Sequence, residues 1–143
     1  MSNGTYATVT TQAWSTYTSV SGRTSTYIDL LTPSYTDFLN GIKVMDGLTA
    51  SLNSPTPPTK DVESALAQIT ILEGAFTNID AVVGKFKSMD ASAVNKAATL
   101  DQAKVRKQLD EAEGYDQDLL NDLNNVLYQC QLMTADAALN SGT

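Results

Sequence analysis

Apolar residues between positions 99 and 139 recur at alternating spacings of four and three. This spacing places nine apolar side chains on one face of a helix, interrupted only by Asp116. The face consists of Val105, Leu109, Ala112, Asp116, Leu119, Leu123, Val126, Cys130, Met133 and Ala137. An unbroken helix of this length would rise about 60 Å, roughly twice the diameter of a small compact domain. The pattern therefore predicts an elongated molecule or a break in this helix.

The same spacing predicts three earlier helices, over residues 12–31, 33–53 and 60–87. Thr32 is a suitable N-cap for the second of them, and Pro33 suits its first position. Prolines at 55, 57 and 58 end that helix and form a joint over residues 54–59. The third helix has the most apolar face, so we expect it at the centre of the core. That face consists of Val62, Leu66, Ile69, Leu72, Phe76, Ile79, Val83 and Phe86.

The segments outside these helices are polar. Residues 2–28 contain 13 Ser or Thr and one charged side chain, Arg23. Within this start, alternating β-branched residues favour an extended arm over residues 1–11. Residues 88–98 predict a loop, and a Thr99–Gln102 capping box begins the last helix, at residues 100–139. The sequence thus predicts one all-α domain: an elongated four-helix bundle with a long C-terminal αα-hairpin and an extended N-terminal arm.

Composition excludes several function classes. The 9 Lys and Arg against 16 Asp and Glu give a formal charge of -7, which disfavours nucleic acid as a partner. The chain has no histidine, which removes His-based acid–base pairs, Ser–His and Cys–His nucleophiles and the carboxylate–histidine motifs of di-iron bundles. A single cysteine excludes an internal disulfide, and Cys130 is expected to be a small buried side chain.

The expected cellular location rests on the lack of a signal peptide and of a membrane-spanning run in the sequence. The N-terminus has neither the basic region nor the apolar run of a cleaved signal peptide, and no later run is judged apolar enough to span a bilayer. We therefore expect a soluble protein that is cytoplasmic, part of a virion, or exported without a signal peptide.

Six acidic residues between positions 110 and 122 form the densest group of titratable side chains: Asp110, Glu111, Glu113, Asp116, Asp118 and Asp122. A calcium loop that began at Asp110 would need an oxygen ligand at its third position, where the chain has Ala112. We therefore expect a solvated helix face here and no metal site. Gly114 lies in the middle of this group and weakens the helix, so it is our candidate hinge.

Trp14, Tyr17, Tyr27 and Tyr35 form an aromatic group near the N-terminus. Core packing explains such a group. A subunit contact explains it as well, because Trp and Tyr are enriched in interface hot spots. We treat these four residues as candidate interface residues.

No residue pattern indicates a catalytic, cofactor-binding or metal site. We expect a non-enzymatic structural subunit that self-assembles through helix packing, such as a filament, needle or virion component. The alternative is a soluble adaptor or chaperone that binds an amphipathic helix of another protein. The expected partner is accordingly a second copy of the chain or another helical protein, with no cofactor and no small-molecule substrate evident.

Overall fold

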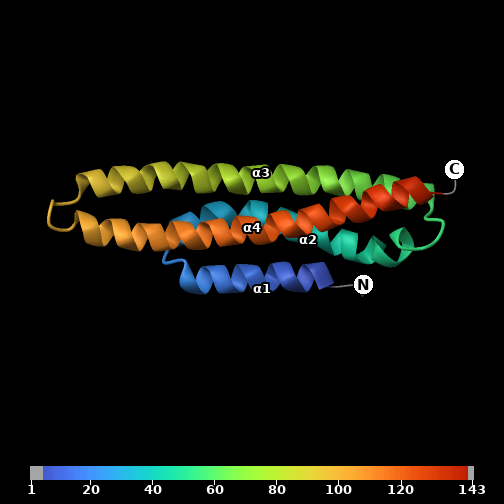
Figure 1. Ribbon diagram of the computed structural model, residues 1–143, viewed down its shortest axis with the longest axis horizontal. Coiled ribbons are helices and arrows are strands. Elements are labelled where there is room, and N and C mark those ends of the chain that lie inside the picture. The colour runs from blue at the N-terminus through green and yellow to red at the C-terminus, as the bar shows by residue number, and fades with distance from the viewer. Residues whose placement is uncertain (1–4, 142–143) are drawn as a thin grey trace.

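The computed structural model describes residues 5–141, which form four α-helices that run in alternating directions (Figure 1). Helix α1 spans Thr5–Val20, α2 spans Ser25–Leu52, α3 spans Thr59–Lys96 and α4 spans Gln102–Asn140. The described residues contain no strand, so the predicted all-α four-helix fold is confirmed. Helices α3 and α4 lie side by side along the length of the molecule and form the long C-terminal αα-hairpin.

The predicted N-terminal arm is wrong, because the chain is helical from Thr5 onward. Residues 1–4 of that arm lie outside the described residues. The helix starts here because α2 caps it. The buried carboxylate of Asp46 accepts hydrogen bonds from the backbone N–H groups of Tyr6 (3.1 Å) and Ala7 (2.9 Å). The first amides of a helix have no partner within it, and an acidic side chain at that end also favours the helix dipole.

The helix predicted over residues 12–31 is instead two helices, separated by a turn at residues 21–24. Gly22 adopts a φ of 66°, a left-handed conformation that glycine accepts without steric penalty. Thr24 then caps α2, because its side-chain oxygen accepts a hydrogen bond from the Tyr27 N–H (3.3 Å). The apolar spacing continues across this turn, so periodicity alone could not locate it.

Pro33 does not begin the second helix but lies within α2, so the predicted start at residue 33 is wrong. Its missing N–H removes one hydrogen bond from the exposed face of the helix. The Thr32 hydroxyl, predicted as a cap, donates to the Ile28 carbonyl one turn back (2.8 Å). The predicted joint after α2 is confirmed, since the helix ends at Leu52 and the prolines follow.

Helix α3 is longer than predicted and continues from residue 87 to Lys96, so most of the expected loop at 88–98 is helical. Two buried side chains, Asp90 and Val94, carry the inward face of α3 into this extension. The helix continues because these side chains have partners to pack against.

The predicted capping box at Thr99 is not formed. Helix α4 begins at Gln102, and its N-cap, Asp101, makes no side-chain hydrogen bond to the helix. The Gln102 side-chain amide donates instead to the Ala97 carbonyl (3.3 Å). The turn between α3 and α4 is therefore closed largely by backbone hydrogen bonds, such as that from Asp101 N–H to the Ala98 carbonyl (2.8 Å).

Helices α2 and α4 each pack against all three other helices, whereas α3 packs against α2 and α4. The expectation that the third helix occupies the centre of the core is therefore wrong. Leu66 on its predicted apolar face is 51% exposed. The fully buried larger side chains of α2 are Tyr27, Leu31, Phe38, Ile42, Met45 and Thr49.

Gly41 sets the close approach of α2 and α3. A Cβ atom at this position would lie 2.7 Å from Cδ2 of Leu72 and 3.1 Å from its Cγ. Leu72 is fully buried, so it has little space into which to move. At Gly47, in contrast, nothing outside the helix lies within 4 Å of an added Cβ.

We expect Gly41→Ala to lower the free energy of unfolding by about 1–2 kcal/mol, because crowding of Leu72 outweighs the gain in helix propensity. Urea unfolding followed by circular dichroism measures this change. Gly47→Ala, the matched control, should raise the free energy of unfolding by up to about 1 kcal/mol. Equal stabilisation by both substitutions would contradict the close approach.

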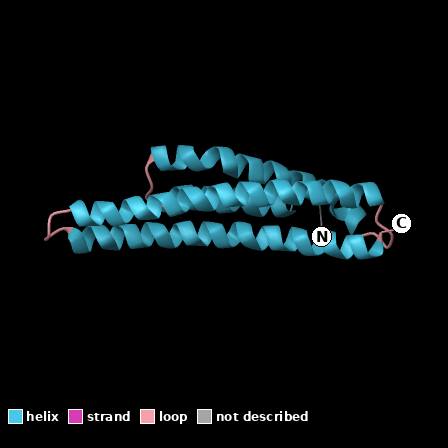
Figure 2. Cartoon of the chain, turned by 90° about the horizontal axis from the view of Figure 1, so that it is seen from above, coloured by secondary structure: helices cyan, strands magenta, loops and turns pink. Residues whose placement is uncertain are grey.

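The α3–α4 hairpin extends beyond the α1–α2 turn at one end of the molecule (Figures 1 and 2). We call residues 85–109 the hairpin end. It begins where the Phe86 ring meets the Tyr27 ring edge-on, at the start of α2 (centroids 4.3 Å apart), and continues past that point. Met89 is 51% exposed and Leu100, in the turn, is 96% exposed. Past its contacts with the start of α2 and the α1–α2 turn, the hairpin end therefore projects as two helices without the cover that α1 and α2 give the rest of the bundle.

Among the described residues, one helix, α3, is long and apolar enough by length and composition to cross a membrane. This differs from the expectation that no run would be apolar enough. A single such helix is weak evidence for a membrane span, because core helices of soluble proteins meet the same criterion.

Candidate functional site

A buried arginine lies at the turn between α1 and α2. The Arg23 side chain is 6% exposed, and its two terminal nitrogens face both oxygens of Asp90, at 2.8 and 2.9 Å. Nη2 also lies 2.6 Å from Oδ2 of Asp116. Asp90 belongs to α3 and Asp116 to α4, so one guanidinium joins the turn to both helices of the hairpin.

Two tyrosines complete this group, which we call the arginine network: Arg23, Asp90, Asp116, Tyr17 and Tyr27. The Tyr17 hydroxyl donates to Oδ1 of Asp116 (2.6 Å), and Cζ of Arg23 lies 4.7 Å from the centroid of the Tyr27 ring. Burial, together with the hydrogen bond to Asp116, raises the pKa of Tyr17. The network therefore includes the ends of α1 and α2 as well as the hairpin.

Two buried polar atoms of the network have no hydrogen-bond partner among the described residues: Nε of Arg23 and the Tyr27 hydroxyl. Burial raises the pKa of Tyr27 to about 12. Tyr17 and Asp116 lie near this hydroxyl, but the geometry of a hydrogen bond is not met. The Tyr17 hydroxyl thus makes a hydrogen bond to a buried carboxylate, whereas the Tyr27 hydroxyl makes none among the described residues.

We expect Tyr17→Phe to lower the free energy of unfolding by about 1.5–3 kcal/mol, because it removes a hydrogen bond to a buried carboxylate. Tyr27→Phe removes a buried hydroxyl that has no partner, so it should leave stability unchanged or raise it. Chemical denaturation of both variants measures the difference. Equal destabilisation by the two substitutions would contradict the assignment of hydrogen bonds.

The charges of the network suit a structural role. Burial disfavours the charged form of Arg23, but hydrogen bonds to Asp90 and Asp116 outweigh this and raise its pKa. Both carboxylates already accept hydrogen bonds from the guanidinium, and a tyrosine with a raised pKa stays neutral near pH 7. The arrangement holds three segments in register and leaves no carboxylate of the network without a donor.

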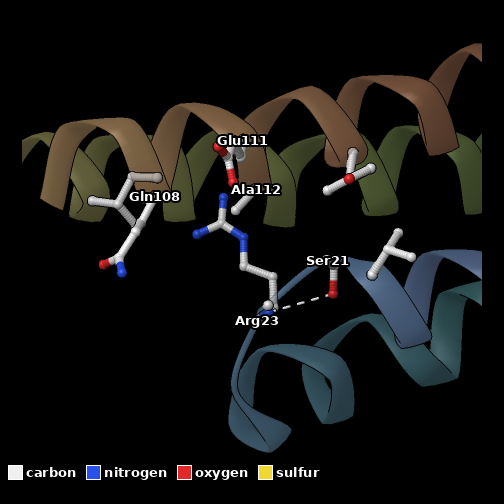
Figure 3. A pocket seen from close by; sticks show the side chains of 9 residues that line it. Ser21, Arg23, Gln108, Glu111 and Ala112 are labelled. Carbon is white, nitrogen blue, oxygen red and sulfur yellow. Dashed lines mark hydrogen bonds between the residues drawn. The ribbon is translucent and has the colours of Figure 1, made fainter. Parts of the chain in front are cut away.

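An open cavity of about 430 Å³ lies beside the network, between the α1–α2 turn and α4 (Figure 3). Arg23 and Ser21 line it from the turn, while Gln108, Glu111 and Ala112 line it from α4. The Arg23 backbone N–H donates to the Ser21 hydroxyl oxygen in this turn (3.4 Å). The lining of the cavity therefore combines Arg23, which is already paired, with the acidic Glu111 and with neutral side chains. This combination matches no single class of ligand.

A second cavity, of about 390 Å³, runs between α1 and α4. Val9 and Ala13 line it from α1, and Asp118, Leu119 and Asp122 line it from α4. Burial and the nearby Asp118 raise the pKa of Asp122. The contact between α1 and α4 is thus open on one side and carries acidic groups at its edge.

Three of the four candidate aromatic residues, Tyr17, Tyr27 and Tyr35, are buried within the chain. Trp14 is half-buried and stacks on Tyr35 (centroids 4.3 Å apart) and on Tyr17 (5.8 Å). Core packing therefore accounts for the three tyrosines. Only Trp14 keeps exposed surface, so a subunit contact stays a prediction for that residue alone.

The acidic group on α4 is not wholly a solvated face, because Asp116 is 2% exposed and belongs to the arginine network. Burial and the neighbouring Asp90 raise the pKa of Glu113. Helix α4 runs through Gly114 without a break, and an added Cβ there would meet nothing within 4 Å. The hinge at Gly114 stays a prediction. The interruption of the apolar face at Asp116 has another cause, the buried arginine.

Cys130 is fully buried, as its place on the apolar face predicts, and burial raises the pKa of its thiol to about 12. Within residues 5–141, no group of three or more Cys, Asp or Glu side chains is arranged to hold a metal ion.

Three buried charged residues were not predicted from the sequence: Arg23, Asp46 and Asp90. One signal for Arg23 was available, since it is the only charge in residues 2–28. Asp46 and Asp90 lie among helix residues of ordinary composition, and nothing in the local pattern marks them.

Comparison with known proteins identifies no relative: no family model, no curated protein and no solved structure matches this chain.

Proposed function

We propose that this protein is a non-enzymatic structural subunit that self-assembles through helix packing. The observation that carries the proposal is the hairpin end, which is basic and partly apolar on an otherwise acidic molecule. Six of the nine basic residues fall within residues 85–109, together with two acidic ones, so this segment carries a formal charge of +4. The rest of the chain has three basic and fourteen acidic residues and carries -11.

Such a charge distribution favours contact between the hairpin end of one copy and the acidic body of another. Complementary charges steer two surfaces together and fix their orientation. Of the basic residues in the hairpin end, Lys104, Arg106 and Lys107 lie exposed near the start of α4. The acidic body would supply their partners, since the basic side chains there are few.

Apolar surface at the hairpin end supports the same proposal. A cavity of about 320 Å³ at its base is lined by Phe86, Met89, Ala93 and Leu109, together with the turn that holds Arg23. The cavity lies where the turn ends the cover that α1 and α2 give the hairpin, and past it the two helices of the hairpin continue alone (Figure 2). A helix from a second copy would bury this surface.

The test is light scattering coupled to size exclusion over a wide range of concentration, with negative-stain images of each peak. We expect discrete oligomers, rods or filaments from the wild-type chain. Lys104→Glu with Lys107→Glu should weaken association at least about tenfold. The matched control, Lys43→Glu with Lys60→Glu, changes the net charge equally but alters the acidic body, so association should persist.

A strictly monomeric chain at every concentration would overturn this proposal. That outcome favours the adaptor, with an amphipathic helix of another protein as the partner. Equal weakening by both charge-reversed variants would mean that net charge, and not the hairpin end, governs association.

A further inference from the structure

Helix α1 is the least firmly anchored helix of the bundle. It packs against α2 and α4, and three of its described side chains are buried: Tyr6, Thr10 and Tyr17. Helix α2 buries ten. A helix that buries few side chains detaches locally at low free-energy cost. The detachment of α1 is therefore the easiest large rearrangement that this fold allows.

The contacts that hold α1 are directional and specific. Asp46 accepts from the first amides of the helix, and the Tyr35 hydroxyl donates to the Thr10 carbonyl in its middle. At its end, Tyr17 donates to Asp116. The groove between α2 and α4 thus presents hydrogen-bonding groups at three levels that match this one helix. Its best occupant is a helix with the sequence of α1.

The turn that folds α1 back onto α2 is short and requires one particular backbone conformation. It comprises residues 21–24 and depends on Gly22 in a left-handed conformation. The three-and-four spacing, however, runs across the turn at Ala13, Tyr17, Val20, Thr24, Tyr27 and Leu31, and the polar Thr24 is its one interruption. If residues 21–24 became helical, α1 and α2 would form one straight helix. Helix α1 would then project past the turn, on the side where the hairpin end extends (Figure 1).

We propose that two copies of this chain exchange α1, so that the α1 of each occupies the groove between α2 and α4 of the other. This inference rests on the proposed self-assembly and names its contact. Exchange preserves the contacts of residues 6–20, because the groove and the helix are identical in both copies. Residues 21–24 change conformation, so the pairs of Arg23 with Asp90 and Asp116 must form again around a helical segment. Exchange also places each hairpin end, with its +4 charge, beside the acidic body of the partner copy.

The exchange is tested with the full chain carrying Trp14→p-benzoylphenylalanine, a photo-crosslinker at the position that stacks on Tyr35 of α2. Natural-abundance and nitrogen-15-labelled chains are mixed, unfolded and refolded together, and the dimer is isolated and irradiated. In an exchanged dimer every crosslink from α1 to α2 joins two chains. About half of these crosslinks then join a light to a heavy peptide.

Crosslinks that join only peptides of the same isotope in the dimer would overturn the exchange and leave self-assembly standing. The absence of any oligomer at all concentrations would overturn both. The two failures are thus distinguishable.

A second variant tests the exchange without the photo-crosslinker. Gly22→Ala strains the turn that folds α1 back, because alanine disfavours a positive φ, whereas alanine suits a helical segment at the same position. Two monomers contain two strained turns, and an exchanged dimer contains none. The monomer–dimer equilibrium should shift at least about tenfold toward dimer. Gly47→Ala, within α2 and free of contacts, should leave this equilibrium unchanged. An unchanged or lower dimer fraction in Gly22→Ala would contradict the exchange.

Discussion

Replacing Arg23 by methionine is expected to lower the free energy of unfolding by about 3–5 kcal/mol. The substitution keeps most of the apolar stem but removes the charge that pairs with Asp90 and Asp116. The side chains of these two aspartates are 9% and 2% exposed, so both would be left buried without a cation. A buried carboxylate that loses its partner bears the full cost of its lost hydration. Denaturant unfolding followed by circular dichroism measures the loss.

Two comparisons separate the network from a general effect of charge. Arg106→Met removes an exposed arginine on α4 and should change the free energy of unfolding by no more than about 0.5 kcal/mol. Adding Asp90→Asn and Asp116→Asn to Arg23→Met removes the unpaired charges and should recover a large part of the stability. If Arg23→Met were as mild as Arg106→Met, the buried network would not hold these helices together.

The protein is also expected to unfold at about pH 11, because several buried groups keep their protons in the folded chain. Burial is the largest cause of a raised pKa at Tyr17, Tyr27, Tyr35 and Cys130, with values of about 12 for Tyr27 and Cys130. The ordinary values are 10.0 for tyrosine and 9.0 for cysteine. Below about pH 9 these groups keep their protons in the folded and in the unfolded chain, so the folded chain has its full stability. This stability is lost only at higher pH. It falls as pH rises, because only the unfolded chain then releases these protons.

The size of this effect follows from the number of groups. Each group that ionises only in the unfolded chain lowers stability by about 1.4 kcal/mol per pH unit above its ordinary pKa. At pH 11 the three tyrosines and Cys130 together lower it by about 7 kcal/mol. This is comparable with the whole stability of a typical small domain, about 5–15 kcal/mol.

Alkaline titration followed by both circular dichroism and tyrosinate absorbance tests this prediction. The absorbance of the buried tyrosines should rise together with the loss of helix. Cys130→Ala removes one of the four groups and should shift unfolding to higher pH, after allowance for the methyl-sized cavity. Tyrosine ionisation that reached completion in a fully helical chain would contradict the burial described above.

The sequence predicted the number and type of helices because the apolar spacing in this chain is regular. The inward face predicted for α4 is largely buried, and Cys130 lies within it as expected. The ends of the helices were less predictable, since they depend on contacts across the bundle. The start of α1 is set by Asp46, 40 positions away from Tyr6, and no local pattern can reveal such a cap.

The buried network was predictable only in outline. The sequence marks its two charged ends, since Asp116 interrupts an apolar face and Arg23 stands alone in an uncharged stretch. That these residues meet could not be inferred, because 93 positions separate them and their contact requires the turn at Gly22. The apolar periodicity predicted one continuous helix over residues 12–31. Within a single chain, the turn at Gly22 prevents that helix from forming.

The basic hairpin end of one copy is proposed to bind the acidic body of another. Sedimentation velocity of the wild-type chain, over a range of concentrations at low and at high salt, tests this contact. We predict oligomers at low salt that dissociate as salt rises, because salt screens the attraction between surface charges. A monomer at every concentration in low salt, or oligomers that are indifferent to salt, would contradict it.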